Sequence, residues 1–118
     1  LYHRNAAGRE RARRGEEVAA LGVEAVQARV LVERETERAK YEAAVAALKL
    51  AASRKDVHSS HERIEDFFQR GLISSTLVIE AHRQILELTR NRNEHELSAI
   101  RALWRIRAID GQILGEKL

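Results

Sequence analysis

The feature that most constrains this chain is the absence of proline from all 118 residues, because proline is the residue that interrupts a helix most strongly. Cysteine and methionine are also absent, and glycine occupies only six positions. Charged residues make up 33% of the chain and aromatic residues only 4%, which is typical of coiled coils and long helices. The composition therefore predicts an all-α chain built from long helices.

One long helix is expected over about residues 9–69, because Gly15 and Gly22 are the only strongly helix-weakening residues there. Residues Leu1 to Gly8 are expected to be irregular, with Asn5 as the helix cap. Apolar residues then follow steps of three and four, as on one face of a helix: Tyr41, Val45, Leu48 and Ala52. At a rise of about 1.5 Å per residue the helix would reach on the order of 90 Å, so it requires lateral partners.

A tight turn is predicted at residues 70–74. Gly71 tolerates the left-handed conformation that commonly closes a helix, and Ser74 or Ser75 can cap the next helix, expected over about residues 75–116. Four apolar residues are expected to hold the two helices together at this end: Phe67, Phe68, Leu72 and Ile73. Residues 1–118 are thus predicted to form a single long antiparallel helical hairpin, a coiled coil.

Two apolar lines run along the second helix. The first is a heptad stripe, formed by Val78, Ile85, Arg92, Ala99, Ile106 and Ile113 together with Ala81, Leu88, His95, Ala102 and Ile109. The second runs beside it through Ile79, Leu86, Asn93, Ile100, Arg107 and Leu114, with Leu103 and Trp104 adding apolar surface. One partner helix cannot cover both lines. We therefore expect hairpins to pack side by side in a larger helical assembly.

Few residues of the sequence are candidates for metal binding or catalysis. Four residues that could ligate a metal lie close in sequence: Asp56, His58, His61 and Glu62. A structural zinc site needs about four convergent ligands, so a solvated polar face is the preferred interpretation, and metal binding by His58 and His61 stays open. His95 is interpreted as a polar core residue that sets the helix register, and His82 beside Glu80 is interpreted similarly. Motifs for catalysis or cofactor binding are absent from the sequence, so neither an enzyme nor a bound cofactor is expected.

The charge pattern argues against a nucleic-acid partner. The net charge is +3, and the two signs are interleaved through most of the chain. The cluster from Arg9 to Arg14 is balanced by Glu10, Glu16 and Glu17, so it is interpreted as a solvated helix end. No run of about 18 apolar residues and no signal-peptide core occur. Since the chain begins at Leu1, we expect an excerpt of a larger protein or a processed form.

The residues around the turn resemble a known family. The segment Phe68-Gln69-Arg70-Gly71-Leu72-Ile73-Ser74-Ser75, followed by Leu77-Val78-Ile79-Glu80-Ala81-His82-Arg83, resembles the helix-turn-helix repeat of TolC-like outer-membrane efflux proteins. In that family an aromatic residue, a basic residue, Gly, a hydrophobic pair and Ser mark the turn, and Ala-x-Arg follows in the next helix. The opening Leu1-Tyr2-His3-Arg4-Asn5-Ala6-Ala7-Gly8 is similar to the segment that leads into the long helix in the heavy-metal efflux branch.

The resemblance covers nearly the whole chain but only one half of such a protein, without the β-strands of the membrane barrel and without the first helical repeat. It implies a wall segment of an α-helical tunnel that three subunits build across the periplasm. The tunnel would belong to an outer-membrane channel that conducts exported metal ions or small molecules passively. Contact with the membrane would be made by parts outside this chain.

The resemblance also implies partners. These are the other subunits of the trimer, an inner-membrane pump, and a periplasmic adaptor protein that docks on the tunnel tip. The tip would be formed by Arg70, Gly71, Leu72, Ile73, Ser74 and Ser75.

Two alternatives stay open at this point. An adaptor hairpin also ends in a turn with Arg, a hydrophobic residue, Gly and Ser, which Arg63, Phe67, Gly71 and Ser74 could mimic. The opening segment and Ala81-His82-Arg83 are less similar to an adaptor. A soluble coiled-coil scaffold without a transport role is the third interpretation.

Overall fold

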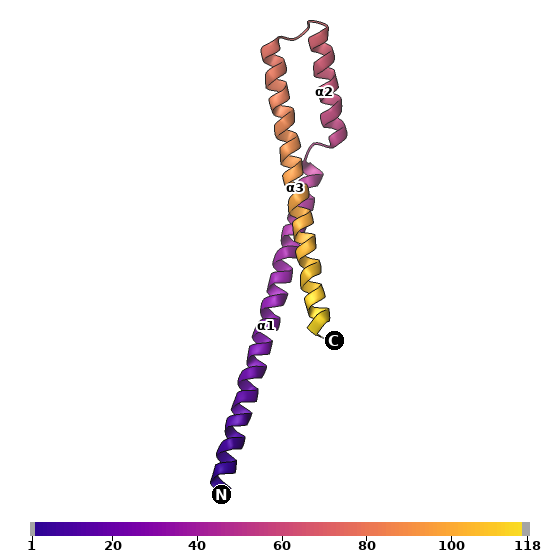
Figure 1. Cartoon of the computed structure of the whole chain (residues 1–118). Coiled ribbons are helices and arrows are strands. Elements are labelled where there is room, and N and C mark those ends of the chain that lie inside the picture. Colours follow the sequence, from indigo (N-terminus) through magenta and orange to yellow (C-terminus); the bar gives the residue numbers. More distant parts are fainter. Residues whose placement is uncertain (1, 117–118) are drawn as a thin grey trace. The chain divides into compact units, whose positions relative to one another are not determined.

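The computed structural model describes the backbone of residues 2–116 and the side chains of residues 5–111. Three helices follow one another along the chain: α1 (Tyr2–Leu50), α2 (Arg54–Gln69) and α3 (Ser75–Glu116) (Figure 1). No strand occurs in the described backbone, so the predicted all-α class is confirmed. The chain divides into two units, one ending at Thr36 and one beginning at Glu37.

The first unit is helical from Tyr2, so the expectation that residues Leu1 to Gly8 are irregular is wrong for the residues described. Asn5 lies within α1 instead of capping it, and Leu1 lies outside the described residues. The residues from Tyr2 to Gly8 are compatible with helix, so nothing in the local sequence forces α1 to begin later. The side chains of Val18 and Leu21 are exposed in this unit.

The helix expected over residues 9–69 is divided in two by an interruption at residues 51–53. Ser53 is the N-cap of α2: its hydroxyl accepts a hydrogen bond from the backbone N–H of Asp56 at 3.1 Å and donates one to the Asp56 carboxylate at 2.5 Å. This cap satisfies a backbone donor that α2 cannot satisfy internally, so a new helix can begin here without glycine or proline.

Side chains of α3 and α2 bond to this interruption and to one another. Arg92 of α3 donates to the carbonyl oxygen of Ala52 at 3.3 Å and to the carboxylate of Glu96 at 3.0 Å. Arg54, the first residue of α2, donates to Glu96 at 2.6 Å and to the side-chain oxygen of Asn93 at 3.1 Å. Arg92 is a polar residue within the apolar heptad stripe, and it supplies the hydrogen-bond donor for the carbonyl of Ala52.

The seam of the hairpin follows the predicted heptad stripe, and the antiparallel helical hairpin is confirmed within the second unit. The buried residues of the seam on α3 are Val78, Ala99, Ala102 and Ile109, and those half-buried are Ala81, Ile85, Arg92, His95 and Ile106. Leu88 departs from the expectation because it is exposed, and the side chain of Ile113 lies outside the described residues. Small residues make the seam narrow: Ala44 of α1 is 5% exposed and Ala102 is 2% exposed.

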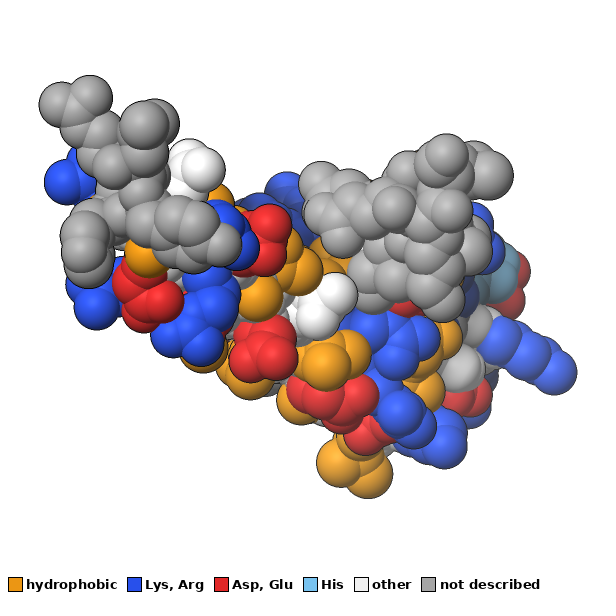
Figure 2. Space-filling model, turned by 90° about the horizontal axis from the view of Figure 1, so that it is seen from below, with side chains coloured by type: hydrophobic (Ala, Val, Ile, Leu, Met, Phe, Trp, Pro, Cys, Tyr) orange, Lys and Arg blue, Asp and Glu red, His pale blue; other side chains and the backbone are white. Residues whose placement is uncertain are grey.

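The second apolar line of α3 is exposed over most of its described residues; Leu103 beside it is half-buried, and the side chain of Leu114 lies outside the described residues. We call the exposed apolar residues of this line the outer face: Ile79, Leu86, Leu97, Ile100 and Trp104. Leu97 joins the line because it lies three residues before Ile100 and seven before Trp104, on one side of the helix. Figure 2 shows hydrophobic side chains exposed among charged ones. Among the described residues, no helix combines the length and apolarity needed to cross a bilayer.

Candidate functional site

The turn between α2 and α3 is closed by backbone hydrogen bonds. The N–H of Gly71 donates to the carbonyl of Phe68 at 2.9 Å, and the N–H of Leu72 donates to the carbonyl of Phe67 at 2.8 Å. This pair of bonds is the Schellman motif, and it requires a left-handed residue at Gly71, whose φ is +71°. Ser74 then caps α3, since its hydroxyl accepts from the N–H of Leu77 at 3.3 Å.

Apolar side chains at the turn face solvent, contrary to the expectation that they lock the two helices together. Leu72 is 59% exposed, Phe68 is 43% exposed and Phe67 is 37% exposed, whereas Ile73 is half-buried. The backbone bonds of the Schellman motif close the turn without help from a buried side-chain cluster, which is why these residues stay available. Arg70 beside them forms an exposed ion pair with Asp66 at 3.3 Å.

The six predicted tip residues Arg70 to Ser75 lie at the end of the hairpin, where the chain passes from α2 into α3 (Figure 1). Together with Phe67 and Phe68 they present exposed apolar groups next to a guanidinium and hydroxyl groups. Aromatic residues and arginine with a polar rim are the composition typical of protein contact surfaces. The tip therefore has the chemistry of a docking surface.

A second arrangement joins two helices further from the turn. His61 and Glu65 lie one turn apart on α2, and His82 lies on α3. His82 Nε2 is 3.0 Å from Glu65 Oε1, and His61 Nε2 is 3.9 Å from the same oxygen. The two imidazole rings have centroids 5.0 Å apart and are inclined at 43°. All three side chains are partly exposed, so solvent reaches the cluster.

The cluster differs from the set considered from the sequence. His58 pairs with Glu62 at 3.3 Å on an exposed part of α2, and Asp56 bonds to Ser53. The four residues from Asp56 to Glu62 are thus not brought together around one point. Sequence reasoning missed His82 as the partner of His61, although a turn centred near residue 72 places positions 61 and 82 at matching distances from it.

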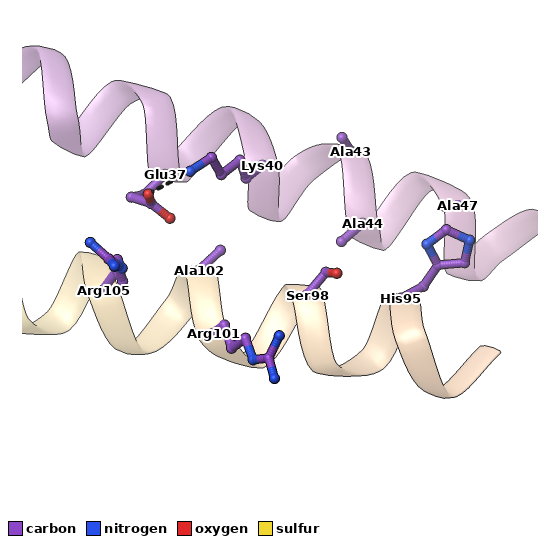
Figure 3. Close-up of a pocket in the computed structure, with 10 residues that line it drawn as sticks. All are labelled: Glu37, Lys40, Ala43, Ala44, Ala47, His95, Ser98, Arg101, Ala102 and Arg105. Carbon is purple, nitrogen blue, oxygen red and sulfur yellow. Dashed lines mark hydrogen bonds and ion pairs between the residues drawn. The ribbon is translucent and has the colours of Figure 1, made fainter. Parts of the chain in front are cut away.

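A groove lies between the last turns of α1 and the middle of α3 (Figure 3). Ala44 of α1 and Ala102 of α3 both point into it at different places along its length, and His95 lines it as a half-buried residue. Glu37 is 6% exposed in spite of its charge, and Lys40 donates to its carboxylate at 2.8 Å. Four of the ten residues that line the groove are alanines: Ala43, Ala44, Ala47 and Ala102.

The electrostatics of the described residues are dominated by local pairs. Near the start of α1, Arg13 and Arg14 pair with Glu10 at 2.9 and 3.5 Å, as a solvated helix end does. In the second unit, the hydrogen bond from Arg54 holds the pKa of Glu96 below its ordinary value, and the charges of Arg54 and Arg92 add to this. The absence of a nucleic-acid partner stays a prediction.

Comparison of the chain with protein-family models, with curated proteins and with solved structures finds no match. The resemblance to the TolC-like family therefore rests on the turn and opening segments alone.

Proposed function

We propose that this chain is one helical hairpin of the periplasmic tunnel of a TolC-like outer-membrane efflux channel. It would act in a tripartite pump as a passive conduit for exported metal ions or small molecules. In this proposal the chain has no catalytic role and holds no cofactor. It acts through two surfaces: the outer face of α3, against neighbouring helices of a trimer, and the tip at Arg70 to Ser75, against the periplasmic adaptor.

The observation that carries the proposal is the exposure of the outer face. Leu86 is 68% exposed, Trp104 is 66% exposed and Ile79 is 63% exposed, on a helix whose seam is already occupied. Fully burying a side chain of this size contributes about 1.5–3 kcal/mol. A helix that leaves several such residues in water gains most by packing against a further helix, as a wall segment of a tunnel does.

The tip supports the docking half of the proposal. A Schellman motif fixes the backbone, so the exposed Leu72 and Phe68 are presented on a turn of defined shape. Apolar anchors held in one conformation lose little conformational entropy when a partner covers them. This favours a docking end over a merely connecting loop.

Two other functions remain as alternatives. The hairpin of a periplasmic adaptor would use the same tip against a channel, and a soluble coiled-coil scaffold would use only the outer face. The exposed apolar tip favours a docking protein over a scaffold, because a scaffold has no need of apolar residues at a turn.

Lateral packing is tested with Trp104, the only tryptophan of the chain and a member of the outer face. If the face associates, Trp104 emission shifts to shorter wavelength as concentration rises, together with a larger mass by light scattering. Replacing both Leu86 and Ile100 by Glu should abolish the two changes. Gln84→Glu adds one negative charge at an exposed site off the face and should leave both changes intact. A monomer with unchanged emission at all concentrations would argue against lateral packing.

Docking is tested by cross-linking from an introduced cysteine, since these 118 residues contain none of their own. In the intact parent protein, Leu72→Cys is treated with a thiol cross-linker in the presence of the pump components, with Ser59→Cys in the middle of α2 as control. Cross-links from residue 72 to the adaptor support the channel, and cross-links to a channel protein support the adaptor alternative. Equal labelling at residues 72 and 59 without a cross-link supports the scaffold.

A further inference from the structure

We propose that His61, Glu65 and His82 form a binding site for a divalent transition-metal ion, with zinc as its representative, that joins α2 to α3. The site lies apart from the tip and shares no residue with the outer face, although His82 neighbours Ile79 and Leu86 along α3, and it does not depend on the proposed transport function. Two imidazoles and one carboxylate are ligand types that zinc takes in proteins, with the fourth position left to water.

The three side chains lie near the distances that such an ion imposes on its ligands. Each of the three residues offers a ligand atom, and these atoms all lie within 4.8 Å of one another. A tetrahedral ion with bonds of about 2.0–2.1 Å spaces its nitrogen and oxygen ligands about 3.3 Å apart. The separation between His82 Nε2 and Glu65 Oε1 is 3.0 Å, and that between His61 Nε2 and Glu65 Oε1 is 3.9 Å. Small rotations of the imidazole side chains therefore suffice to close the site.

The backbone holds the ligands in place. His61 and Glu65 are four residues apart on α2, so their side chains lie on the same face of the helix. His82 is on α3, whose position relative to α2 is fixed nearby by the Schellman turn and the packing of Val78. Ligands already placed on two rigid helices lose little entropy when an ion binds.

The local charges also favour a cation. Arg54 and Arg92 line the groove beside His61, and both pair with Glu96, at 2.6 and 3.0 Å. Glu96 thus offsets part of their positive charge. Glu65 supplies an anionic ligand between the two imidazoles, and its side chain is 38% exposed, so an ion from solvent can reach it.

The chain contains its own control for this site. His58 and Glu62 have the same residue types and the same spacing of four as His61 and Glu65, and they lie on the same helix. His58 is 72% exposed, and the cluster with a histidine of α3 forms at His61 instead. A nonspecific affinity of surface histidines for zinc would involve His58 as much as His61.

The experiment is zinc titration of the untagged chain by calorimetry, together with thermal unfolding with and without zinc. We expect one ion per chain and a rise in Tm, because an ion that binds only the folded state stabilises it. Replacing a residue that only hydrogen-bonds to a metal ligand typically weakens metal binding by about 10–100-fold. Loss of a ligand itself should cost at least as much, so His82→Ala and Glu65→Gln should each weaken zinc binding by about tenfold or more. His58→Ala should leave affinity and the rise in Tm unchanged.

Circular dichroism verifies that each variant keeps its helix content, so that a loss of binding is not a loss of folding. Cobalt provides a second readout, since coordination by imidazole and carboxylate produces a visible absorption band that His82→Ala should remove and His58→Ala should keep. Zinc binding of equal strength in the native chain and in His82→Ala would overturn the proposal. So would the absence of any binding by the native chain at neutral pH.

Discussion

Arg92 of α3 donates a hydrogen bond from Nη1 to the main-chain oxygen of Ala52, across 3.3 Å and 40 positions of sequence. Ala52 lies in the interruption between α1 and α2, where a carbonyl loses its helical partner. The same guanidinium reaches Glu96 through Nε at 3.0 Å. A charged residue in an apolar stripe is therefore part of the mechanism that accommodates the interruption.

Arg92→Ala is expected to lower the free energy of unfolding by about 1 kcal/mol, the usual contribution of one hydrogen bond. The reason is that the Ala52 carbonyl loses its protein donor and must find water. Urea unfolding followed by circular dichroism measures the change. Arg90→Ala, two residues earlier and exposed, should alter stability by a few tenths of a kcal/mol at most. Equal effects of the two substitutions would contradict the role given to Arg92.

Ser53→Ala is expected to destabilise the hairpin by about 1 kcal/mol through loss of the N-cap of α2. Ser59 lies inside α2, where alanine is the better helix former, so Ser59→Ala should stabilise the helix slightly. The two substitutions remove the same hydroxyl from the same helix and should act with opposite signs. Thermal unfolding of both variants tests this, and a shift in the same direction would count against the cap.

The interruption at residues 51–53 was not predicted from the sequence, although the turn at residues 70–74 was expected. The turn contains Gly71, which has a positive φ, and a glycine at a helix end is a strong local signal for such a position. The interruption contains Ala51, Ala52 and Ser53, which a helix also accepts, and its bonds to Arg92 come from a distant part of the chain. The contact between His61 and His82 was also missed, because it depends on the register of α2 against α3, which the local sequence does not reveal.

Gly71→Ala is expected to cost about 1 kcal/mol, because a Cβ disfavours the left-handed conformation that the turn requires. The expected loss of stability does not come from a steric clash with a neighbour, since a Cβ at Gly71 would meet no atom within 4 Å. Gly111→Ala provides the control: it lies in α3 with equally open surroundings, and alanine there should stabilise by about 1 kcal/mol. Chemical unfolding distinguishes these signs, and a neutral Gly71→Ala would contradict the argument.

Glu96 should make stability depend on pH. The hydrogen bond from Arg54 lowers its pKa in the folded chain below the ordinary 4.5, so on acidification the unfolded chain takes up the proton first. The stabilisation is therefore complete above pH 4.5 and is lost as pH falls through the lowered pKa. Glu96→Gln should be less stable than the native chain at pH 7, and the difference should shrink steadily below pH 4.5 in urea unfolding series. A difference independent of pH would exclude this origin.

Ala102→Leu tests the narrow seam between α1 and α3. Ala102 is 2% exposed and points into the gap between α3 and α1, as Ala44, 5% exposed, does from the other side, so a larger side chain must push the helices apart or leave its preferred rotamer (Figure 3). Such overpacking typically costs about 1–3 kcal/mol. Ala108→Leu makes the same change at an exposed position of α3 and should be nearly neutral. If thermal unfolding shows Ala102→Leu to be neutral as well, the alanines do not set the spacing of the helices.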